Sequence, residues 1–137
     1  MDAFERAVEI IGGFDYSMRR AAAPFADLSK GVGNIAADRK AIAGQSFHEI
    51  DILLLPVTAT TTLRIEQATQ PLALSPEYTL FANYYGLPAV SVPCGFDRNG
   101  LPLGLQIVAK PWDEAAVLRL AHRFQKATGF ESERLPA

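Results

Sequence analysis

The feature that most constrains the fold is an alternation of apolar with small or polar residues on both sides of the tetrapeptide Asp-Arg-Asn-Gly. Residues 90–96 alternate before this turn sequence, and residues 101–107 alternate after it. Period-two alternation around a turn containing Asn-Gly predicts a β-hairpin. One face should carry the larger apolar side chains, Val90, Val92, Cys94 and Phe96, and the other the small ones, Ser91, Pro93, Gly95, Pro102 and Gly104.

The hairpin contains a serine and the only cysteine of the chain, which raises the question of a nucleophile. Ser91 stands in mid-strand between Val90 and Val92, without the Gly-x-Ser-x-Gly spacing of a nucleophile elbow. Cys94 is predicted on the apolar face, where a thiol behaves as a small hydrophobic group and no base is expected to ionise it. Both residues are therefore interpreted as scaffold, and another backbone is expected to approach the small face closely.

The segments before the hairpin predict helices and one buried strand. An apolar stripe at helical spacing, which includes Phe4 and Ile11, stops at Gly12-Gly13. Phe14, Met18 and Phe25 continue that spacing, so residues up to about 50 are predicted to be helical, with Asn34 capping a helix that runs to about Glu49. Residues 52–57 form a short continuous apolar run, typical of a strand covered on both faces.

The remaining segments have clear start and stop signals. An unpatterned stretch, residues 58–74, predicts a long surface loop. Ser75, Pro76 and Glu77 predict a helix start with Ser75 as its N-cap, and Gly86 predicts the end of that helix. Residues 113–128 predict an amphipathic surface helix that ends at Gly129. Strands are predicted only at residues 52–57 and in the hairpin, so these strands should need further neighbours for their apolar faces. The predicted helices are expected to cover one face of them.

Composition excludes several function classes. Thirteen Lys and Arg are outweighed by fifteen Asp and Glu, without a basic run, so direct nucleic-acid binding is not expected. A single cysteine excludes an internal disulfide, the N-terminus lacks the pattern of a signal peptide, and no apolar run is long enough to span a membrane. The sequence therefore predicts a cytoplasmic protein. His48 and His122 stand without a second ligand at metal-binding spacing, so neither a metal site nor a cofactor is expected.

The segments "DILLLPVTAT", "YTLFANYYGLPAVSVPCGFDRNGLPLGLQIVA" and "DEAAVLRLAHRFQKATG" resemble, in this order, the C-terminal portion of the amidase signature family of serine hydrolases. The resemblance covers about residues 47–129, whereas the part before Asn34 resembles the family only in being helical. This divides the chain into a helical lead, residues 1–33, and an amidase-like segment, residues 34–137. The motif residues that carry the resemblance are Pro56, Thr58, Thr79, Asn83, Gly86, Pro88, Ser91, Pro93, Gly95, Gly104 and Gln106.

The resemblance implies an α/β/α fold around a mixed sheet and hydrolysis of an amide to a carboxylate and ammonia. It also implies a serine nucleophile, a second serine and a lysine base in a Gly- and Ser-rich segment. That segment is missing from this sequence, because its one Gly-Gly pair is followed by Phe14. No catalytic residue is therefore assigned, and the motif residues are given structural roles. Pro56 and Thr58 should lie at a strand end, and the polar groups of Thr79 and Asn83 should fix the loop before the hairpin.

Three functions are compatible with these residues. The favoured one is the C-terminal part of an amidase that acts on a small amide, is incomplete alone, and associates with the missing N-terminal portion or with itself. The second is part of the glutaminase A subunit of a tRNA-dependent amidotransferase. Resembling sequences of that type place an aspartate where this chain has Pro76, and Arg39 is a poorly aligned candidate for their carboxylate-binding arginine. The third is a noncatalytic protein-binding module.

Overall fold

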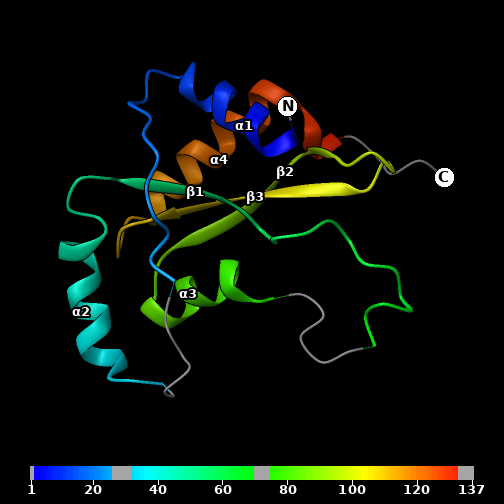
Figure 1. Cartoon of the computed structure of the whole chain (residues 1–137). Helices are drawn as coiled ribbons and strands as arrows, with labels where there is room; N and C mark the ends of the chain where they lie inside the picture. Colours follow the sequence, from blue (N-terminus) through cyan, green and yellow to red (C-terminus); the bar gives the residue numbers. More distant parts are fainter. Residues whose placement is uncertain (1, 26–31, 70–74, 133–137) are drawn as a thin grey trace.

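The computed structural model describes residues 2–25, 32–69 and 75–132. Three strands form a sheet, and helices lie above and below it (Figure 1). In chain order the elements are α1 (Ala3–Gly12), α2 (Ile35–Gln45), β1 (Ile52–Pro56), α3 (Glu77–Tyr85), β2 (Ala89–Phe96), β3 (Pro102–Ala109), α4 (Glu114–Thr128) and the 3-10 turn η1 (Phe130–Ser132).

The strand order in the sheet is β1-β3-β2, and both neighbouring pairs are antiparallel. The predicted hairpin is confirmed as β2 and β3, and the predicted buried strand is β1. The α/β class is as expected, although the sheet of the described residues is antiparallel throughout, where a mixed sheet was expected. Because β3 has a neighbour on each side, its side chains are the most deeply buried, and Leu105, Ile107 and Val108 are completely inaccessible to solvent.

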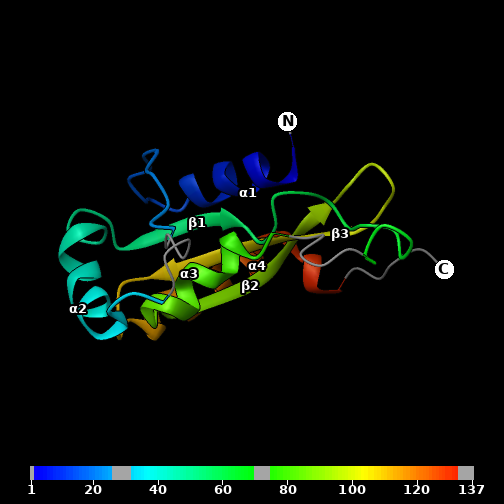
Figure 2. The same ribbon diagram turned by 60° about the horizontal axis from the view of Figure 1, so that its bottom comes forward.

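Helices cover both faces of the sheet (Figure 2), so the expectation of cover on one face is wrong. On one face α1 and α4 enclose a core that includes Ile11, Leu105 and Phe124. On the other face α2 and α3 enclose a second core that includes Phe81 and Val108. Successive residues of β3 point to alternate faces, so this one strand contributes to both cores.

The helix ends follow the local signals in the sequence. The Asn34 side chain accepts a hydrogen bond from the amide of Ala37 at 3.2 Å, as expected of an N-cap, although α2 ends at Gln45, before the predicted Glu49. Gly86 and Gly129 adopt left-handed conformations directly after α3 and α4, as predicted. Among the described residues, no helix is both long and apolar enough to cross a membrane.

The prediction that the helical spacing continues after Gly12-Gly13 is wrong. Residues 16–25 are not helical, because Asp15 adopts a left-handed backbone (φ 67°) directly after the end of α1. Their apolar side chains instead pack at separate places, where Phe25 makes edge contacts with Tyr78 and Phe81 of α3. Among the described residues of the predicted helical lead, α1 alone is helical, and residues 26–31 lie outside the described residues.

The predicted cap of α3 is displaced by one residue. Pro76, rather than Ser75, is the N-cap and supplies no side-chain hydrogen bond. The Ser75 hydroxyl instead donates to the Glu77 carboxylate at 2.6 Å. Proline at the cap leaves the amides of the first turn of α3 without the side-chain acceptor that the sequence had suggested.

A β-bulge in β2 changes the predicted facing of the hairpin. Pro93 lies opposite Gly104 but Gly95 lies opposite Leu103, so β2 contains one extra residue there. As a result Cys94 is in the core under α1, as predicted, but Gly95 faces the same side, where a Cβ would lie 3.3 Å from that of Ala3. Beyond the bulge, Phe96 pairs with Pro102 on the opposite face from Cys94, contrary to strict alternation.

Both free edges of the sheet carry a proline whose nitrogen points outward. The Val57 amide donates to the Gly104 carbonyl at 3.1 Å, and the Ala109 amide donates to the Pro88 carbonyl at 3.1 Å. Because hydrogen-bonded pairs alternate in antiparallel sheets, these two bonds fix which residues face outward. The outward positions are Ile52, Leu54 and Pro56 on β1, and Ala89, Ser91 and Pro93 on β2. The motif prolines therefore remove one outward donor from each edge.

Candidate functional site

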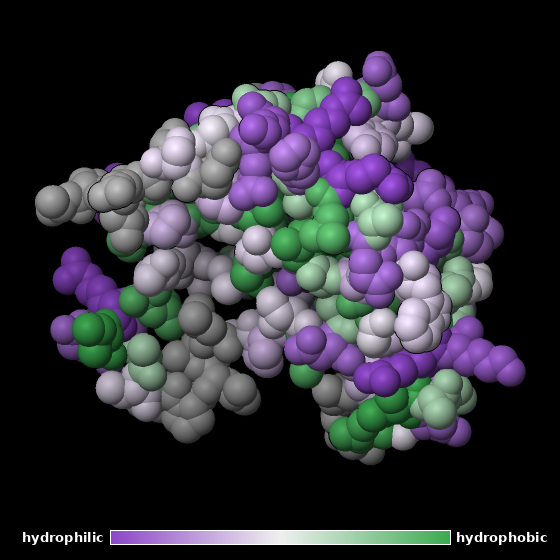
Figure 3. All heavy atoms as spheres, turned by 180° about the vertical axis from the view of Figure 1, so that it is seen from behind, coloured by the Kyte–Doolittle hydropathy of each residue, from purple (hydrophilic) through white to green (hydrophobic). Residues whose placement is uncertain are grey.

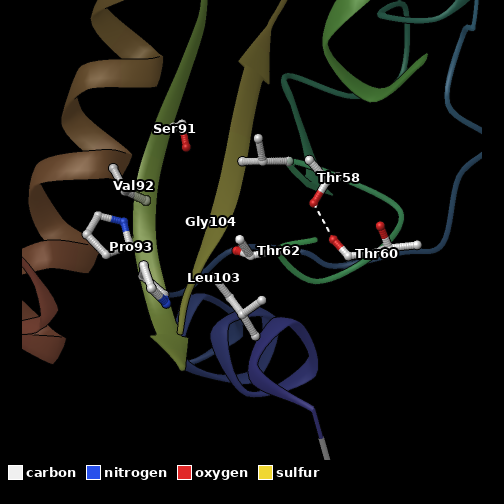
Figure 4. A pocket seen from close by; sticks show the side chains of 10 residues that line it. Thr58, Thr60, Thr62, Ser91, Val92, Pro93, Leu103 and Gly104 are labelled. Atoms are coloured by element: carbon white, nitrogen blue, oxygen red, sulfur yellow. Dashed lines mark hydrogen bonds between the residues drawn. The ribbon is translucent and has the colours of Figure 1, made fainter. Parts of the chain in front are cut away.

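The site candidate is an open groove of about 360 Å³ over the turn end of the hairpin (Figure 4). Three segments form it: residues 57–62 after β1, residues 91–93 of β2 and residues 102–104 of β3. In chain order its lining is Val57, Thr58, Thr60, Thr62, Ser91, Val92, Pro93, Pro102, Leu103 and Gly104. Four motif residues of the sequence analysis, Thr58, Ser91, Pro93 and Gly104, thus lie together in one place.

The groove exists because Gly104 lets the chain after β1 lie directly on the hairpin. A Cβ at Gly104 would be 2.7 Å from Cγ2 of Val57, closer than nonbonded carbon atoms approach, and a tight 3.1 Å from Oγ of Ser91. The close neighbour of the small face is therefore the side chain of Val57, where the approach of another backbone had been predicted. The turn that follows is held by the Thr58 hydroxyl, which donates to the Thr60 carbonyl at 2.6 Å, and this bond directs residues 58–62 along the groove.

The chemistry of the lining is that of hydroxyl and apolar groups. Ser91 and the three threonines supply the hydroxyls, and Val57, the prolines and Leu103 supply the apolar surface. Among the described residues that line the groove there is no carboxylate, imidazole, amine or guanidinium. Ser91 therefore has no general base within this lining, and the arrangement is suited to binding a neutral polar group rather than to activating a nucleophile.

The cysteine of the hairpin is equally unsuited to nucleophilic chemistry. Cys94 is buried in the core below α1, at 3% exposure. Burial raises the pKa of the Cys94 thiol to about 11, and the negative charge of Asp2 adds to the increase. The thiol is therefore protonated at neutral pH, as the interpretation of Cys94 as scaffold required.

The hydrogen bonds that hold helix α3 differ from those predicted. The Thr79 hydroxyl donates to the Pro76 carbonyl at the start of its own helix at 3.2 Å. The main-chain carbonyl of Asn83 accepts a hydrogen bond from Arg39. Neither bond joins α3 to the loop before the hairpin, as had been expected of Thr79 and Asn83. The first turn of α3 is held instead by Gln106, whose buried amide Nε2 donates to the Tyr78 carbonyl at 2.7 Å. This bond gives the motif residue Gln106 its structural role.

The other end of α3 is held by residues of α2 that the sequence reasoning did not place there. Arg39 Nε donates to the Tyr84 carbonyl at 2.7 Å, and its Nη2 donates to the Asn83 carbonyl at 3.1 Å. The Tyr84 hydroxyl donates to Asp38 at 2.6 Å, and this bond raises the pKa of Tyr84 to about 12. The Arg39 guanidinium also lies against Gly86, where a Cβ would be 3.4 Å from Nε. No local pattern signals these contacts, because about 45 residues separate the partners.

The two histidines lie outside the groove. His48 is exposed and lies 3.2 Å from the carboxylate of Glu49, and the hydrogen bond from Arg19 holds the pKa of that carboxylate below its usual range. His122 is exposed on α4. Within residues 2–25, 32–69 and 75–132, no cluster of three or more His, Cys, Asp or Glu side chains is arranged to hold a metal ion.

Comparison with known proteins associates this arrangement with one family. The model of the amidase family matches residues 28–118. Similar curated proteins include the A subunit of glutamyl-tRNA(Gln) amidotransferase from Brevibacillus brevis, 45% identical over 87 residues, and the one from Lysinibacillus sphaericus, 41% identical over 97 residues. The alignments cover 61% and 69% of this chain but only 18% and 20% of the relatives. The chain thus spans about a fifth of the length of the curated relatives it matches.

Solved structures show the same relationship. The A subunit of glutamyl-tRNA(Gln) amidotransferase from Thermotoga maritima has a TM-score of 0.57 and 31% identity, over 67% of this chain and 21% of that one. A bacterial aryl acylamidase of the amidase signature enzymes has a TM-score of 0.60 over 96% of this chain and 27% of that one. At 22% identity, the second comparison shows likeness in fold alone.

Proposed function

Since this chain belongs to the amidase family, we propose that it forms one part of an amide hydrolase and supplies a wall of the substrate pocket rather than the reacting groups. The observation that carries the proposal is the match of the family model to residues 28–118, which includes the whole groove. The resemblance of residues 47–129 to the C-terminal portion of amidases supports the placement of this part within the enzyme.

The groove suits a neutral amide. A primary amide presents a carbonyl acceptor, an N–H donor and an apolar substituent. Hydroxyls both donate and accept, so Ser91 and the threonines of the groove satisfy either end of an amide, while Leu103 and Val57 contact the substituent. A charged substrate would find no counter-charge among the described lining residues.

The nucleophile and base come, in this proposal, from a part of the amidase fold that the residues of this sequence do not supply. Ser91 has no base in the groove lining, and the high pKa of Cys94 keeps its thiol protonated. The family resemblance implies a serine nucleophile and a lysine base, and the other part of the amidase fold is the partner that would carry them.

A second candidate is part of an amidotransferase A subunit. It is favoured by the names of the similar curated proteins, which are 38% to 45% identical to this chain. Two features of this chain oppose it. Pro76 occupies the N-cap of α3, where resembling sequences of that type have an aspartate for the amino group of glutamine. Arg39 is engaged with two carbonyls at the end of α3 and does not line the groove. We therefore place direct hydrolysis of a neutral amide first.

The first test uses the purified 137-residue chain. It should release no ammonia from aliphatic or aromatic amides and should not be labelled by a serine-reactive fluorophosphonate. The matched control is Ser91→Ala, which should behave identically. Stoichiometric labelling of the wild-type chain that is lost in Ser91→Ala would contradict the assignment of the reacting groups to another segment.

The second test supplies the rest of the fold. In a graft, residues 47–129 of this chain replace the matching segment of the Thermotoga maritima A subunit, whose structure is known. The graft should hydrolyse neutral amides in preference to glutamine. A graft that folds and prefers glutamine would favour the amidotransferase candidate, and a folded graft without either activity would count against the proposed function.

A further inference from the structure

The turn between β3 and α4 presents one tryptophan almost entirely to solvent. Trp112 is 91% exposed and is the only tryptophan of the chain. The turn lies at the opposite end of β3 from the groove, because the groove is formed at Pro102 and Gly104, and β3 ends at Ala109. Trp112 is therefore separate from the candidate pocket.

Ion pairs and hydrogen bonds hold the turn on both sides of Trp112. Lys110 Nζ lies 3.1 Å from the Asp51 carboxylate at the start of β1 and 3.9 Å from that of Asp113. The Asp113 amide donates to the Lys110 carbonyl at 3.2 Å, and the Asp113 carboxylate caps α4 through the Ala116 amide. The exposure of Trp112 is thus built into the turn. Its one cation, Lys110, lies between the carboxylates of Asp51 and Asp113, so the turn carries a net negative charge.

The backbone of Trp112 is strained as well as exposed. Its φ is +69°, in the left-handed region where glycine is favoured and a bulky side chain is disfavoured. Among the described residues, the other non-glycine residue in this region is Asp15, a type whose side chain tolerates the conformation. Stability of the turn alone would therefore favour glycine at position 112, because tryptophan adds both backbone strain and an indole in water.

The sheet edges and the face seen in Figure 3 offer weaker means of association. Each sheet edge has a proline at an outward position, Pro56 on β1 and Pro93 on β2, which limits strand addition. On the face seen in Figure 3, hydrophobic side chains occur in small groups between hydrophilic ones rather than as one broad apolar surface. Tryptophan, by contrast, is among the residue types that most often dominate binding energy at interfaces.

From these observations we propose that Trp112 is an anchor that inserts into an apolar pocket on the remaining part of the amidase fold, where its indole N–H donates to an acceptor. The inference rests on the proposed function, in which this chain is one part of a larger enzyme. The indole is apolar apart from its one N–H, so an apolar pocket with a single acceptor is the surface that fits it. About four-fifths of the length of the relatives lies outside the matched segment and is available to form that pocket.

The test compares the same substitutions in two contexts. In the isolated chain, Trp112→Gly relieves the left-handed strain and should raise the melting temperature by about 2–5 °C, and Trp112 emission should be fully quenched by acrylamide at every protein concentration. In the graft described above, Trp112→Gly should lower the melting temperature by about 5 °C or more, because it empties the pocket. Trp112→Phe is the matched control and should retain most of the stability of the graft.

Each outcome decides the proposal. If Trp112→Gly raises the melting temperature equally in both contexts, Trp112 is not an anchor. If Trp112 emission in the isolated chain shifts to the blue as concentration rises, the occupant is a second copy and the proposal is wrong. If the graft folds without amidase activity while Trp112→Gly lowers its melting temperature and raises that of the isolated chain, the result contradicts the proposed function alone and supports the anchor. A graft that does not fold, when its parent does, overturns both.

Discussion

Gly104→Ala tests the contact that creates the groove. The new methyl group would lie 2.7 Å from Cγ2 of Val57 and 3.1 Å from Oγ of Ser91. Val57 has little room to withdraw, because its amide is bonded to the Gly104 carbonyl at 3.1 Å. Overpacking of this kind costs about 1–3 kcal/mol in the free energy of unfolding. Replacing glycine also lowers the entropy of the unfolded chain by an equivalent of about 0.5–1 kcal/mol, so the net loss should be about 1–2 kcal/mol.

Gly44→Ala is the matched control. Gly44 lies in α2, and a Cβ there would have no atom within 4 Å. The same chemical change should therefore stabilise the protein by about 0.5–1 kcal/mol, opposite in sign to its effect at Gly104. Urea unfolding followed by far-UV circular dichroism measures both, since the exposed Trp112 makes fluorescence a poor probe of unfolding.

The double variant Val57→Ala with Gly104→Ala identifies the cause. Removing the Val57 methyl groups should make Gly104→Ala nearly neutral, which corresponds to a coupling energy of about 1 kcal/mol or more between the two positions. The reasoning is refuted if Gly104→Ala alone lies within about 0.5 kcal/mol of wild type. It is also refuted if Gly104→Ala lowers the free energy of unfolding by the same amount in the wild-type protein and in the Val57→Ala variant.

Three further predictions concern buried or shifted groups. Cys94 should react with Ellman's reagent only on unfolding. Because folding raises the pKa of its thiol from 9.0 to about 11, the stabilisation from the protonated thiol is complete below pH 9 and is lost as the pH rises through 11. Cys94→Ala cannot ionise and should therefore not show this loss of stability. In a spectrophotometric titration the Tyr84 phenol should ionise near pH 12, and Asp38→Asn should lower this value. Gln106→Leu should cost about 1–2 kcal/mol in urea unfolding because the Tyr78 carbonyl loses its donor, whereas retention of full stability would show that the bond is dispensable.

The sequence by itself determined the features that depend on neighbouring residues. Gly12-Gly13, Asn34 and Gly129 mark helix ends because caps satisfy local backbone groups, and the structure has them at those places. The turn at residues 97–100 and the alternation on either side specified the hairpin and the burial of Cys94. Motif spacing identified the family. The start of α3 was predicted one residue too early, since Pro76 rather than Ser75 is its N-cap.

Only the tertiary structure decided the features that depend on distant contacts. The spacing of Phe14 and Phe25 imitates a helix, but these rings contact Arg123 and α3, which are separate parts of the fold. The bulge at Cys94 reverses the facing of Gly95, because one added residue shifts every later side chain of β2 by one position. The packing of Val57 beside Gly104 and the hydrogen bonds from Arg39 to α3 join residues about 45 apart in the chain. Local sequence contains no record of such pairings.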